Sequence, residues 1–329
     1  MQTNHITRTR DDAGVPPLKV LSLCSGIGGD VAALEYAGIP HDVAAVAEID
    51  PIASAVLAQK FPTVPNLGDL TLADWSKHHE AIDILIAGIP CQPYSVAGRQ
   101  RGVEDRRDVT ADIVRIVRDV RPRYVLFENV AQYETLHGGK ALDELRTGLV
   151  GFGYTVDHLV IDAAQVLPQR RKRLFILGCR GDAGGSPSQI LADAASGGRR
   201  AEACGTARLP SADAASGGAS VLHPPRLGTL MASGSGMNRP GMRGHELDFL
   251  VVQAFEGLGL VVRRPTPLEA LRAQGFPDDW FDGISLAGKA LTDLQKYKLI
   301  GNSWPVPVTA AILAGIFRHA QPGHLAQAA

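Results

Sequence analysis

The sequence predicts an α/β fold: a doubly wound, Rossmann-like sheet joined to a smaller, irregular domain. Short apolar segments alternate along the chain with segments whose apolar residues recur at helical spacing, the order expected when helices cover a mostly parallel sheet. The short segments are apolar at successive positions rather than at every second one, which is typical of strands buried on both faces. After Gly178 the composition changes to a stretch rich in Gly, Ala and Ser, which predicts a separate, irregular part.

The first half of the chain supplies the predicted sheet. An apolar strand at 18–23 leads through a glycine loop into a helix that ends at Gly38, because glycine accepts the left-handed conformation of a helix C-terminus. A second strand at 43–49 precedes a helix that begins at Pro51, since proline suits the first helical position. A third strand is expected to end near Asp69. The alternation continues with strands at 82–89, 124–127, 154–161 and 173–177 and helices at 111–120 and 141–149.

The second half departs from this alternation and then returns to it. Residues 181–220 are rich in Gly, Ala and Ser and contain ADAASGG twice, at 192–198 and at 212–218. Two copies are too few for a repeat architecture, so we interpret them as a duplicated flexible loop. Patterning resumes with strands at 249–252 and 260–262 and helices at 268–273 and 308–317. We therefore expect one domain made of 1–181 and 285–329, and a small domain at 182–284 whose variable part is 182–262.

Composition excludes several classes of protein. With 329 residues, of which 45% are hydrophobic and 20% charged, the chain has the apolar surface that disordered chains lack. No uninterrupted apolar run approaches about 18 residues, so no membrane span is expected, and the polar N-terminus lacks the apolar stretch of a secretion signal. The 4 cysteines include no CxxC pair, which indicates a reducing compartment such as the cytoplasm and no metal site.

The net charge of −1 excludes a uniformly basic nucleic-acid binder, but the charge is unevenly distributed. Residues 18–90 carry 3 Lys, no Arg and 9 acidic residues, a net charge of −6. Residues 91–264 carry 23 basic and 18 acidic residues, a net charge of +5. One part of the chain therefore suits a cationic ligand, and another suits phosphates.

A glycine loop and a carboxylate predict a cofactor site. The loop Gly26-Ile27-Gly28-Gly29 lies between a strand and a helix, where glycine lets the backbone approach a ligand and helix N–H groups face it. Glu48 lies 20 residues beyond Gly28, at the end of the next strand, where a carboxylate can accept hydrogen bonds from ribose hydroxyls. The pair indicates an adenosine-bearing cofactor, either a dinucleotide or S-adenosylmethionine. A structural turn with a surface glutamate is the alternative.

A cysteine and several charged residues follow other predicted strands. Cys91 comes directly after the most apolar strand, at the sheet edge where ligands of open α/β folds bind. A thiol is mostly protonated at neutral pH, so a nucleophilic role needs an activating environment, and a buried structural cysteine is the alternative. The polar loop 94–108 carries four arginines and two glycines and is suited to close over an anionic polymer. Glu128 and the basic run 169–173 stand at two further strand ends.

Eight segments of the chain form an ordered set of motifs. They are LSLCSGIGG (21–29), AEID (47–50), GDL (68–70), GIPCQPYSVAGRQRG (88–102), FENV (127–130), PQRRKRLF (168–175), RPTPLEALRAQGFPD (264–278) and KLIGNSWPVPV (298–308). PCQ alone is weak, but PCQ, ENV, QxRxR, QGFP and GNS in this order are specific. The set resembles that of DNA (cytosine-5) methyltransferases of the bacterial and phage type, over most of 18–180 and 264–317.

The resemblance implies a fold, a reaction and catalytic residues. The fold is the S-adenosylmethionine-dependent methyltransferase sheet, with a target-recognition domain in the insert. The Cys91 thiolate would add to C6 of a cytosine flipped out of the duplex. Glu128 would protonate N3, and C5 would then take the methyl group of S-adenosylmethionine. Arg171 is similar to the family residue that contacts the base and supports the nucleophile, and Gln169 and Arg173 would organise the site.

The resemblance also implies binding residues. Those for the cofactor, with Glu48 on the ribose and with Ile49 and Asp69 on the adenine, are Cys24, Ser25, Gly26, Ile27, Gly28, Gly29, Glu48, Ile49, Asp69, Leu70, Pro90, Asn302 and Ser303. Those for DNA are Gln92, Ser95, Gly98, Arg99, Gln100 and Arg101 in the closing loop and Thr229, Leu230, Asn238 and Arg239 in the insert. Six positions depart from the family pattern, which has Asp, an aromatic residue, Gly, Leu, Arg and Val there: Ser22, Cys24, Leu167, Pro265, Leu268 and Trp304.

The substrate and partners are weighed against alternatives. Double-stranded DNA is the expected partner of a monomeric enzyme, either beside a separately acting restriction endonuclease or as a stand-alone enzyme. One branch of the family methylates cytosine in tRNA, a substrate that the long insert disfavours. A non-catalytic DNA-binding member is disfavoured by the intact Cys91, Glu128 and Arg171. A dehydrogenase gives no reason for the PCQ and GNS motifs.

Overall fold

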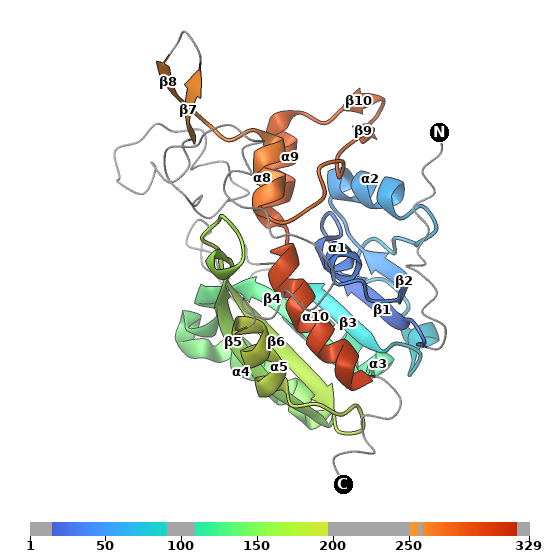
Figure 1. The fold of residues 1–329 in the computed structure, drawn as a ribbon. Helices are drawn as coiled ribbons and strands as arrows, with labels where there is room; N and C mark the ends of the chain where they lie inside the picture. The colour runs from blue at the N-terminus through green and yellow to red at the C-terminus, as the bar shows by residue number, and fades with distance from the viewer. Residues whose placement is uncertain (1–14, 91–108, 197–250, 256–258, 321–329) are drawn as a thin grey trace.

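The computed structural model describes residues 15–90, 109–196, 251–255 and 259–320, and its centre is a six-stranded mixed sheet (Figure 1). The strand order is β2-β1-β3-β4-β6-β5. The first four strands are parallel, and β6 is antiparallel to both β4 and β5. The strands are β1 (Leu18–Leu23), β2 (His41–Ala47), β3 (Ile84–Gly88), β4 (Tyr124–Val130), β5 (Tyr154–Asp162) and β6 (Lys172–Arg180). The predicted doubly wound α/β sheet is confirmed.

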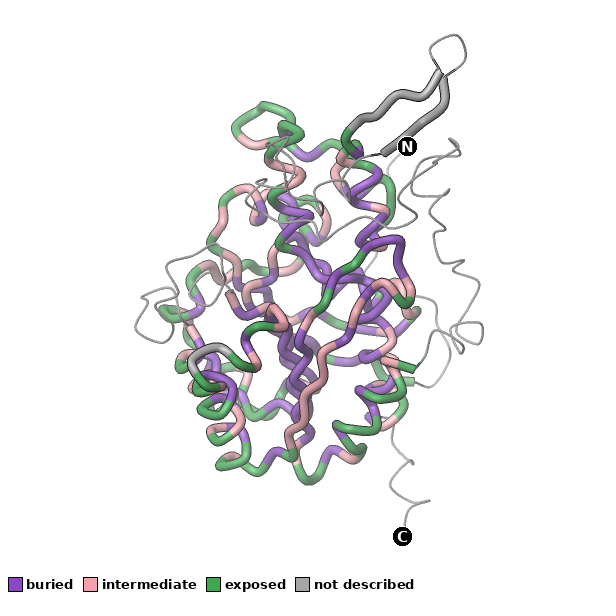
Figure 2. Tube along the Cα trace, turned by 90° about the vertical axis from the view of Figure 1, so that its left-hand side faces the viewer, coloured by how far each residue is buried: buried purple, intermediate pink, exposed green. Residues whose placement is uncertain are grey.

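Helices cover both faces of this sheet (Figure 1). One apolar core lies under α1 (Gly29–Tyr36), α2 (Pro51–Lys60), α5 (Pro187–Ser196) and α10 (Val306–Ala320). The other lies under α3 (Thr110–Val120) and α4 (Lys140–Gly151). Figure 2 shows the buried residues concentrated between these layers. Short 3-10 turns complete the connections: η1 (Ser76–His78), η3 (Ala131–Glu134), η4 (Leu136–Gly139) and η5 (Ala163–Gln165).

The strand order turns back at β1 and β3. From β1 the chain moves to β2 on one side, and from β3 it moves to β4 on the other. The crevice beyond the carboxyl ends of β1 and β3 is therefore the topological switch point, where open α/β sheets bind ligands. Both the glycine loop after β1 and the Cys91 segment after β3 leave the sheet at this place.

Two expectations about elements are wrong. No third strand ends near Asp69, because residues 67–69 pair with no strand and Asn66 forms only an isolated bridge to Val46. The first ADAASGG copy is not a flexible loop as far as Ser196, because its first five residues end α5. Helix α5 buries Ile190 and Leu191 against the core under α10, which holds it as a helix.

The region after the insert builds a small set of elements beside the sheet. An antiparallel hairpin of β7 (Val251–Phe255) and β8 (Gly259–Arg263) corresponds to the expected strand pair. It is followed by α8 (Pro267–Ala273), β9 (Ser285–Leu286), β10 (Lys289–Ala290) and α9 (Asp293–Asn302). The division of the chain at 182 and 284 stays a proposal, and the packing of α5 on the sheet domain favours a first boundary after Ser196.

Helix α10 returns the chain to the sheet, where it packs beside α1 (Figure 1). The stretch Asp293–Ala320 is long and apolar enough to cross a membrane, but 83% of its most apolar window is buried inside the protein. It comprises α9 and α10 with a break between them. Its apolarity is accounted for by packing in the core of the sheet domain.

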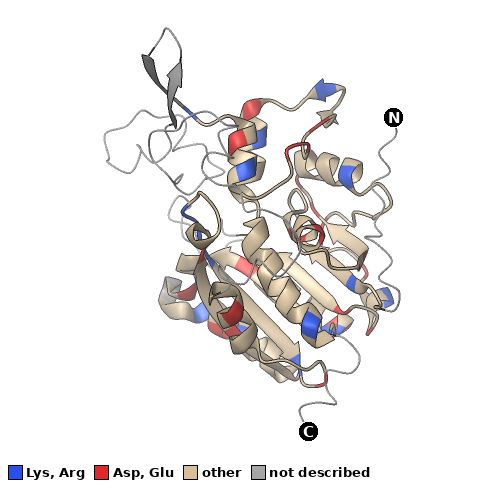
Figure 3. Cartoon of the chain, viewed as in Figure 1, with Lys and Arg blue, Asp and Glu red and all other residues tan. Residues whose placement is uncertain are grey.

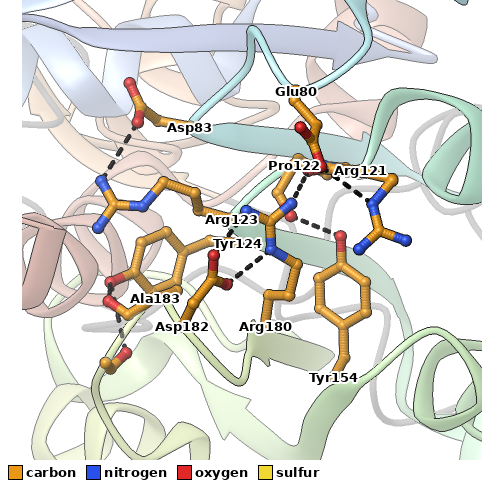
Figure 4. A network of polar contacts seen from close by, with 11 residues as sticks. Glu80, Asp83, Arg121, Pro122, Arg123, Tyr124, Tyr154, Arg180, Asp182 and Ala183 are labelled. Carbon is orange, nitrogen blue, oxygen red and sulfur yellow. Dashed lines mark hydrogen bonds and ion pairs between the residues drawn. The ribbon is translucent and has the colours of Figure 1, made fainter.

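A network of polar contacts connects the elements that meet at the amino ends of the central parallel strands (Figure 4). Arg180 pairs with Asp182 at 2.7 Å and donates to the Arg121 carbonyl at 2.5 Å. Arg123 lies 3.4 Å from Asp83 and donates to the Ala320 carbonyl at 3.3 Å. These contacts join the start of β4, the end of β6 and the end of α10, at the edge opposite the glycine loop.

Candidate active site

The loop between β1 and α1 holds its shape through a carboxylate from the neighbouring strand. Gly26 and Gly28 have φ angles of 55° and 77°, which glycine adopts without steric cost. The Gly26 N–H donates to Glu48 Oε2 at 2.7 Å, and the Asp50 N–H donates to Oε1 at 2.7 Å. Each carboxylate oxygen keeps a further lone pair. Glu48 is thus fixed beside the loop and can still accept hydrogen bonds from a ligand.

The expected adenine contacts lie next to this carboxylate. Ile49 is 73% exposed, which leaves a flat apolar surface beyond the end of β2. Asp69 accepts hydrogen bonds through Oδ1 from the Thr71 N–H at 2.9 Å and from its hydroxyl at 2.8 Å, while Oδ2 has no partner among the described residues. Asn66, which the sequence did not single out, accepts from the Glu48 N–H at 3.0 Å and donates to the Glu48 carbonyl at 3.1 Å.

Other expected cofactor residues shape the site rather than present side chains to it. Leu70 is buried, and its carbonyl accepts from the Trp75 indole at 3.0 Å. Ser25 is buried, and its hydroxyl accepts from the Ser22 hydroxyl at 2.7 Å. Gly28 and Gly29 leave no room for a side chain, because an added Cβ would lie 2.7 Å from the Phe61 ring or the Ser303 hydroxyl.

The thiols that the structure describes are not nucleophiles. Burial, together with the negative charges of Glu48 and Asp69, raises the pKa of Cys24 to about 12. Burial likewise raises the pKa of Cys179 to about 12. Both stay protonated at neutral pH and lack the thiolate needed for attack. Cys91, the expected nucleophile, lies outside the described residues.

Glu128 stands at the carboxyl end of β4, beside the segment that leads to Cys91. The Ile89 N–H donates to the Glu128 carbonyl at 3.0 Å, two residues before the cysteine. The Glu128 side chain is 10% exposed, and its Oε1 lies 2.7 Å from Arg173 Nε on the adjacent β6. A carboxyl group and a guanidinium are thus held together near the start of the expected nucleophile loop.

Arg171, which directly precedes β6, is buried beside the C-terminal segment. It is 1% exposed, and its Nη2 donates to the Gly301 carbonyl at 3.0 Å and to the Ser303 carbonyl at 2.5 Å. Gly301 lies in the last turn of α9 and Ser303 directly follows that helix, so this guanidinium joins the start of β6 to the returning C-terminal segment. The contact with the base that the resemblance implies for Arg171 stays a prediction. Gln169 is also fully buried.

The C-terminal segment brings two of the expected cofactor residues back to the glycine loop. Asn302 ends α9 and is exposed, whereas Ser303 is buried. The Ser303 hydroxyl lies 2.7 Å from where a Cβ of Gly29 would be, and its oxygen has no partner among the described residues. Gly29 and Ser303, 274 positions apart in the sequence, therefore meet at the switch point.

Asp30 is a buried charge that the sequence did not single out. It lies in the first turn of α1, is 1% exposed, and its Oδ1 has no partner within the described part of the chain. Burial raises the pKa of Asp30 to about 6, although hydrogen bonds from Ser22 and backbone N–H groups lower it. The sequence feature that could have singled out Asp30 is its position directly after Gly28 and Gly29.

The expected DNA contacts are not placed. Those in the closing loop and those in the insert all lie outside the described residues: Gln92, Ser95, Gly98, Arg99, Gln100, Arg101, Thr229, Leu230, Asn238 and Arg239. Pro90, the last described residue before the loop, is half-buried at the end of the β3 segment.

Known proteins share these motifs and this fold. The family model described as C-5 cytosine-specific DNA methylase matches residues 18–201 and 251–318. The chain is 31% identical to Type II methyltransferase M.NgoBI of Neisseria gonorrhoeae, covering 89% of this chain and 91% of that protein. It is 34% identical to Orphan methyltransferase M.SPRI of Bacillus phage SPR, over 50% of this chain and 38% of that protein. The S. pombe Dnmt2 methyltransferase structure superposes with a TM-score of 0.65 at 20% identity, covering 92% of this chain and 98% of that one.

Proposed function

This chain belongs to the C-5 cytosine-specific DNA methylase family and is a DNA (cytosine-5) methyltransferase, and we propose the residues by which it works. The observation that carries the proposal is the meeting of Glu128 and Arg173, 2.7 Å apart, beside the segment that leads into Cys91. An acid, a cation and a cysteine gathered at one edge of the sheet suit attack on a pyrimidine ring.

S-adenosylmethionine fits the residues at the ends of β1 and β2. The Glu48 carboxylate is held by two backbone N–H groups and can accept from ribose hydroxyls. The exposed Ile49 side chain offers an apolar face to adenine, and Asp69 Oδ2 offers an acceptor to its amine. The buried Ser303 hydroxyl, without a partner in the described part of the chain, lies at the glycine loop. When bound, the cofactor supplies the methyl group.

The chain's own groups would prepare the cytosine for methylation. Cys91 adds through sulfur to C6, which raises the electron density at C5. Glu128 gives its proton to N3 and so stabilises the ring that carries the adduct. After C5 has been methylated, water takes the C5 proton, N3 returns its proton to Glu128, and departure of the Cys91 thiolate restores the aromatic ring. Because C6 is inaccessible in a stacked duplex, the base must first leave the helix.

Different parts are proposed for Arg173 of β6 and for Arg171, which directly precedes that strand. Arg173 lies beside Glu128, so we assign it to the base and to the orientation of that carboxyl group. Arg171 donates to the Gly301 and Ser303 carbonyls, so we assign it a positioning role in addition to the contact with the base and the nucleophile that the resemblance implies.

Double-stranded DNA is the proposed substrate, bound on the side of the insert. Arg170 and Lys172 are exposed on the β5–β6 connection, and Arg264 is exposed before α8. Figure 3 shows Lys and Arg positions on this connection and on the helices after the insert, together with Asp and Glu positions on those helices. Phosphate contacts from such residues provide affinity, whereas the insert and closing loop would read the base sequence.

The biological setting follows from this substrate. We place the enzyme in the cytoplasm of a bacterial or phage-infected cell, acting as a monomer. It serves either beside a separately acting restriction endonuclease or alone. The relatives support both settings, since one is named a type II methyltransferase and another an orphan methyltransferase of a phage.

The test is bisulfite sequencing of DNA from a methylation-free host that expresses the full chain. We expect cytosines in one fixed sequence context to be protected, and no protection with Cys91→Ser. A genome without a protected context would contradict the proposal. Protection in tRNA but not in DNA would move the activity to RNA.

A further inference from the structure

Trp304 occupies the switch point of the sheet. It follows Ser303 in the turn between α9 and α10 and is 3% exposed. Its Nε1 lies 3.1 Å from where a Cβ of Gly88 would be, and the Cys24 carbonyl lies 3.5 Å from the same point. Gly88 ends β3 and Cys24 follows β1. The nitrogen edge of the indole therefore lies over the carboxyl ends of these two strands.

The surrounding residues hold the ring in this place. An added Cβ on Gly29 would lie 3.3 Å from the Trp304 Cβ. On the other side, the ring packs against Phe175 of β6, with centroids 6.3 Å apart. The absence of a side chain at both Gly29 and Gly88 is what gives a ring of this size its room.

The indole N–H of Trp304 has no acceptor among the described residues. The other two tryptophans differ in this respect, because Trp75 donates to the Leu70 carbonyl at 3.0 Å and Trp280 donates to the Ile27 carbonyl at 3.1 Å. Trp304 as a whole is 3% exposed, but its Nε1 atom is not buried, so the N–H is open to a ligand in the crevice. An unpaired donor in a ligand crevice points to an acceptor on the ligand.

The two ends of the cofactor differ in what they offer this donor. This step rests on the proposed function, in which Glu48, Ile49 and Asp69 take the ribose and adenine at the end of β2. The methionine end then lies toward β1 and β3, beside Trp304. Its sulfonium and ammonium groups are cations and cannot accept a hydrogen bond, whereas its carboxylate can. We infer that the Trp304 indole N–H binds the carboxylate of the methionine part of S-adenosylmethionine.

The test compares two ligands that differ only at that end. S-adenosylhomocysteine carries the carboxylate, and 5′-methylthioadenosine lacks the whole amino-acid group. Calorimetry on the full chain should show that Trp304→Phe, which keeps a ring but loses the donor, weakens S-adenosylhomocysteine about tenfold. The affinity for 5′-methylthioadenosine should change less than about twofold. Equal losses for both ligands, or none for either, would overturn the inference.

A second measurement uses the unaltered protein. Its 3 tryptophans give three indole N–H signals in a ¹⁵N-labelled sample. We expect the unbonded one to move downfield with S-adenosylhomocysteine and to stay in place with 5′-methylthioadenosine, whereas three unmoved signals would contradict the contact. If the wild-type protein bound neither ligand, the proposed function itself would fail. If it bound both while Trp304→Phe changed nothing, only this inference would fail.

Discussion

Two arginines two positions apart, Arg171 directly before β6 and Arg173 within it, have different surroundings. Arg171 is buried and donates to the Gly301 and Ser303 carbonyls. Arg173 is 11% exposed at the side chain and meets Glu128 at the edge of the crevice. The first arginine fixes the C-terminal segment on the sheet domain, and the second lies beside the acid expected to act on the substrate.

Lysine at each position separates the two roles. We expect Arg171→Lys to lower the free energy of unfolding by about 1–3 kcal/mol, because an ammonium does not reproduce the guanidinium fork between two carbonyls. Arg173→Lys keeps a cation beside Glu128 and should change stability by less than about 1 kcal/mol. Its single-turnover methylation rate should fall at least about tenfold. Urea unfolding and rapid-quench kinetics measure the two effects, and the reverse pattern would contradict the assignment.

Asp30 predicts how stability depends on pH. Because burial raises its pKa from 3.8 to about 6, the folded protein binds this proton more tightly than the unfolded chain does. The contribution of Asp30 to stability is therefore most favourable below pH 4 and is lost as the pH rises through about 6. The full difference is on the order of 3 kcal/mol.

Asp30→Asn removes this dependence. The variant should gain stability relative to the wild type between pH 4 and pH 7, by up to on the order of 3 kcal/mol. Urea unfolding of both proteins at several pH values measures the difference, in which the other titrating groups cancel. A difference that does not change with pH would show that the Asp30 carboxyl is not buried as described.

At the scale of elements, caps rather than apolar periodicity fix where the site residues lie. Asp50 accepts from the Ile52 N–H at 2.9 Å and the Ala53 N–H at 3.1 Å, so α2 begins directly after Glu48 and Ile49. The same carboxylate meets Lys298 of α9 at 2.9 Å. One residue thus starts a helix of the sheet domain and ties it to the C-terminal segment.

Two substitutions of Asp50 separate the contribution of the helix cap to stability from that of the ion pair with Lys298. Asp50→Ala should cost about 1 kcal/mol of unfolding free energy through loss of the cap. Asp50→Asn keeps a capping oxygen and loses only the exposed ion pair, which is worth about 0–1 kcal/mol. Thermal unfolding compares them. Equal destabilisation by both would show that the Lys298 contact, not the cap, is the dominant interaction.

The sequence predicted elements better than it predicted contacts. Strands with continuous apolar runs and helices with a proline start, such as β1 and α2, were found with errors of a few residues. Helix α5 was missed because small residues such as Ala and Ser carry little periodic signal, and its stability comes from packing on α10. Spacing likewise does not reveal that Gly301 and Ser303, far along the chain, accept hydrogen bonds from Arg171.

At the scale of the whole molecule, a near-neutral chain separates its charges. The part from 18 to 90 has a net charge of −6 and contains the residues proposed to bind a cationic cofactor. Arg170 and Lys172 are exposed at the β5–β6 connection, where Figure 3 shows Lys and Arg positions. Charges placed this way attract phosphates without making the cofactor crevice basic. The topology then brings both parts to the same edge of the sheet.

This arrangement predicts that Arg170 and Lys172 contribute to the salt dependence of DNA affinity. Replacing both Arg170 and Lys172 with Gln should reduce the slope of log Kd against log salt by about 1–2. Lys77→Gln, at an exposed position in η1 near the opposite edge of the sheet, is the control and should leave the slope unchanged. Filter binding between low and moderate salt measures the slopes, and equal slopes for all three proteins would exclude this face as the DNA surface.

The central claim is that Cys91 attacks cytosine C6 in DNA. Duplex DNA made with 5-fluorocytosine tests it directly. Fluorine replaces the C5 hydrogen whose loss as a proton allows the Cys91 thiolate to leave, so the covalent adduct is trapped. With S-adenosylmethionine we expect a protein–DNA complex that survives denaturing electrophoresis, and no such complex with Cys91→Ser. No trapped complex with the wild-type protein, or one that persists with Cys91→Ser, would contradict the account.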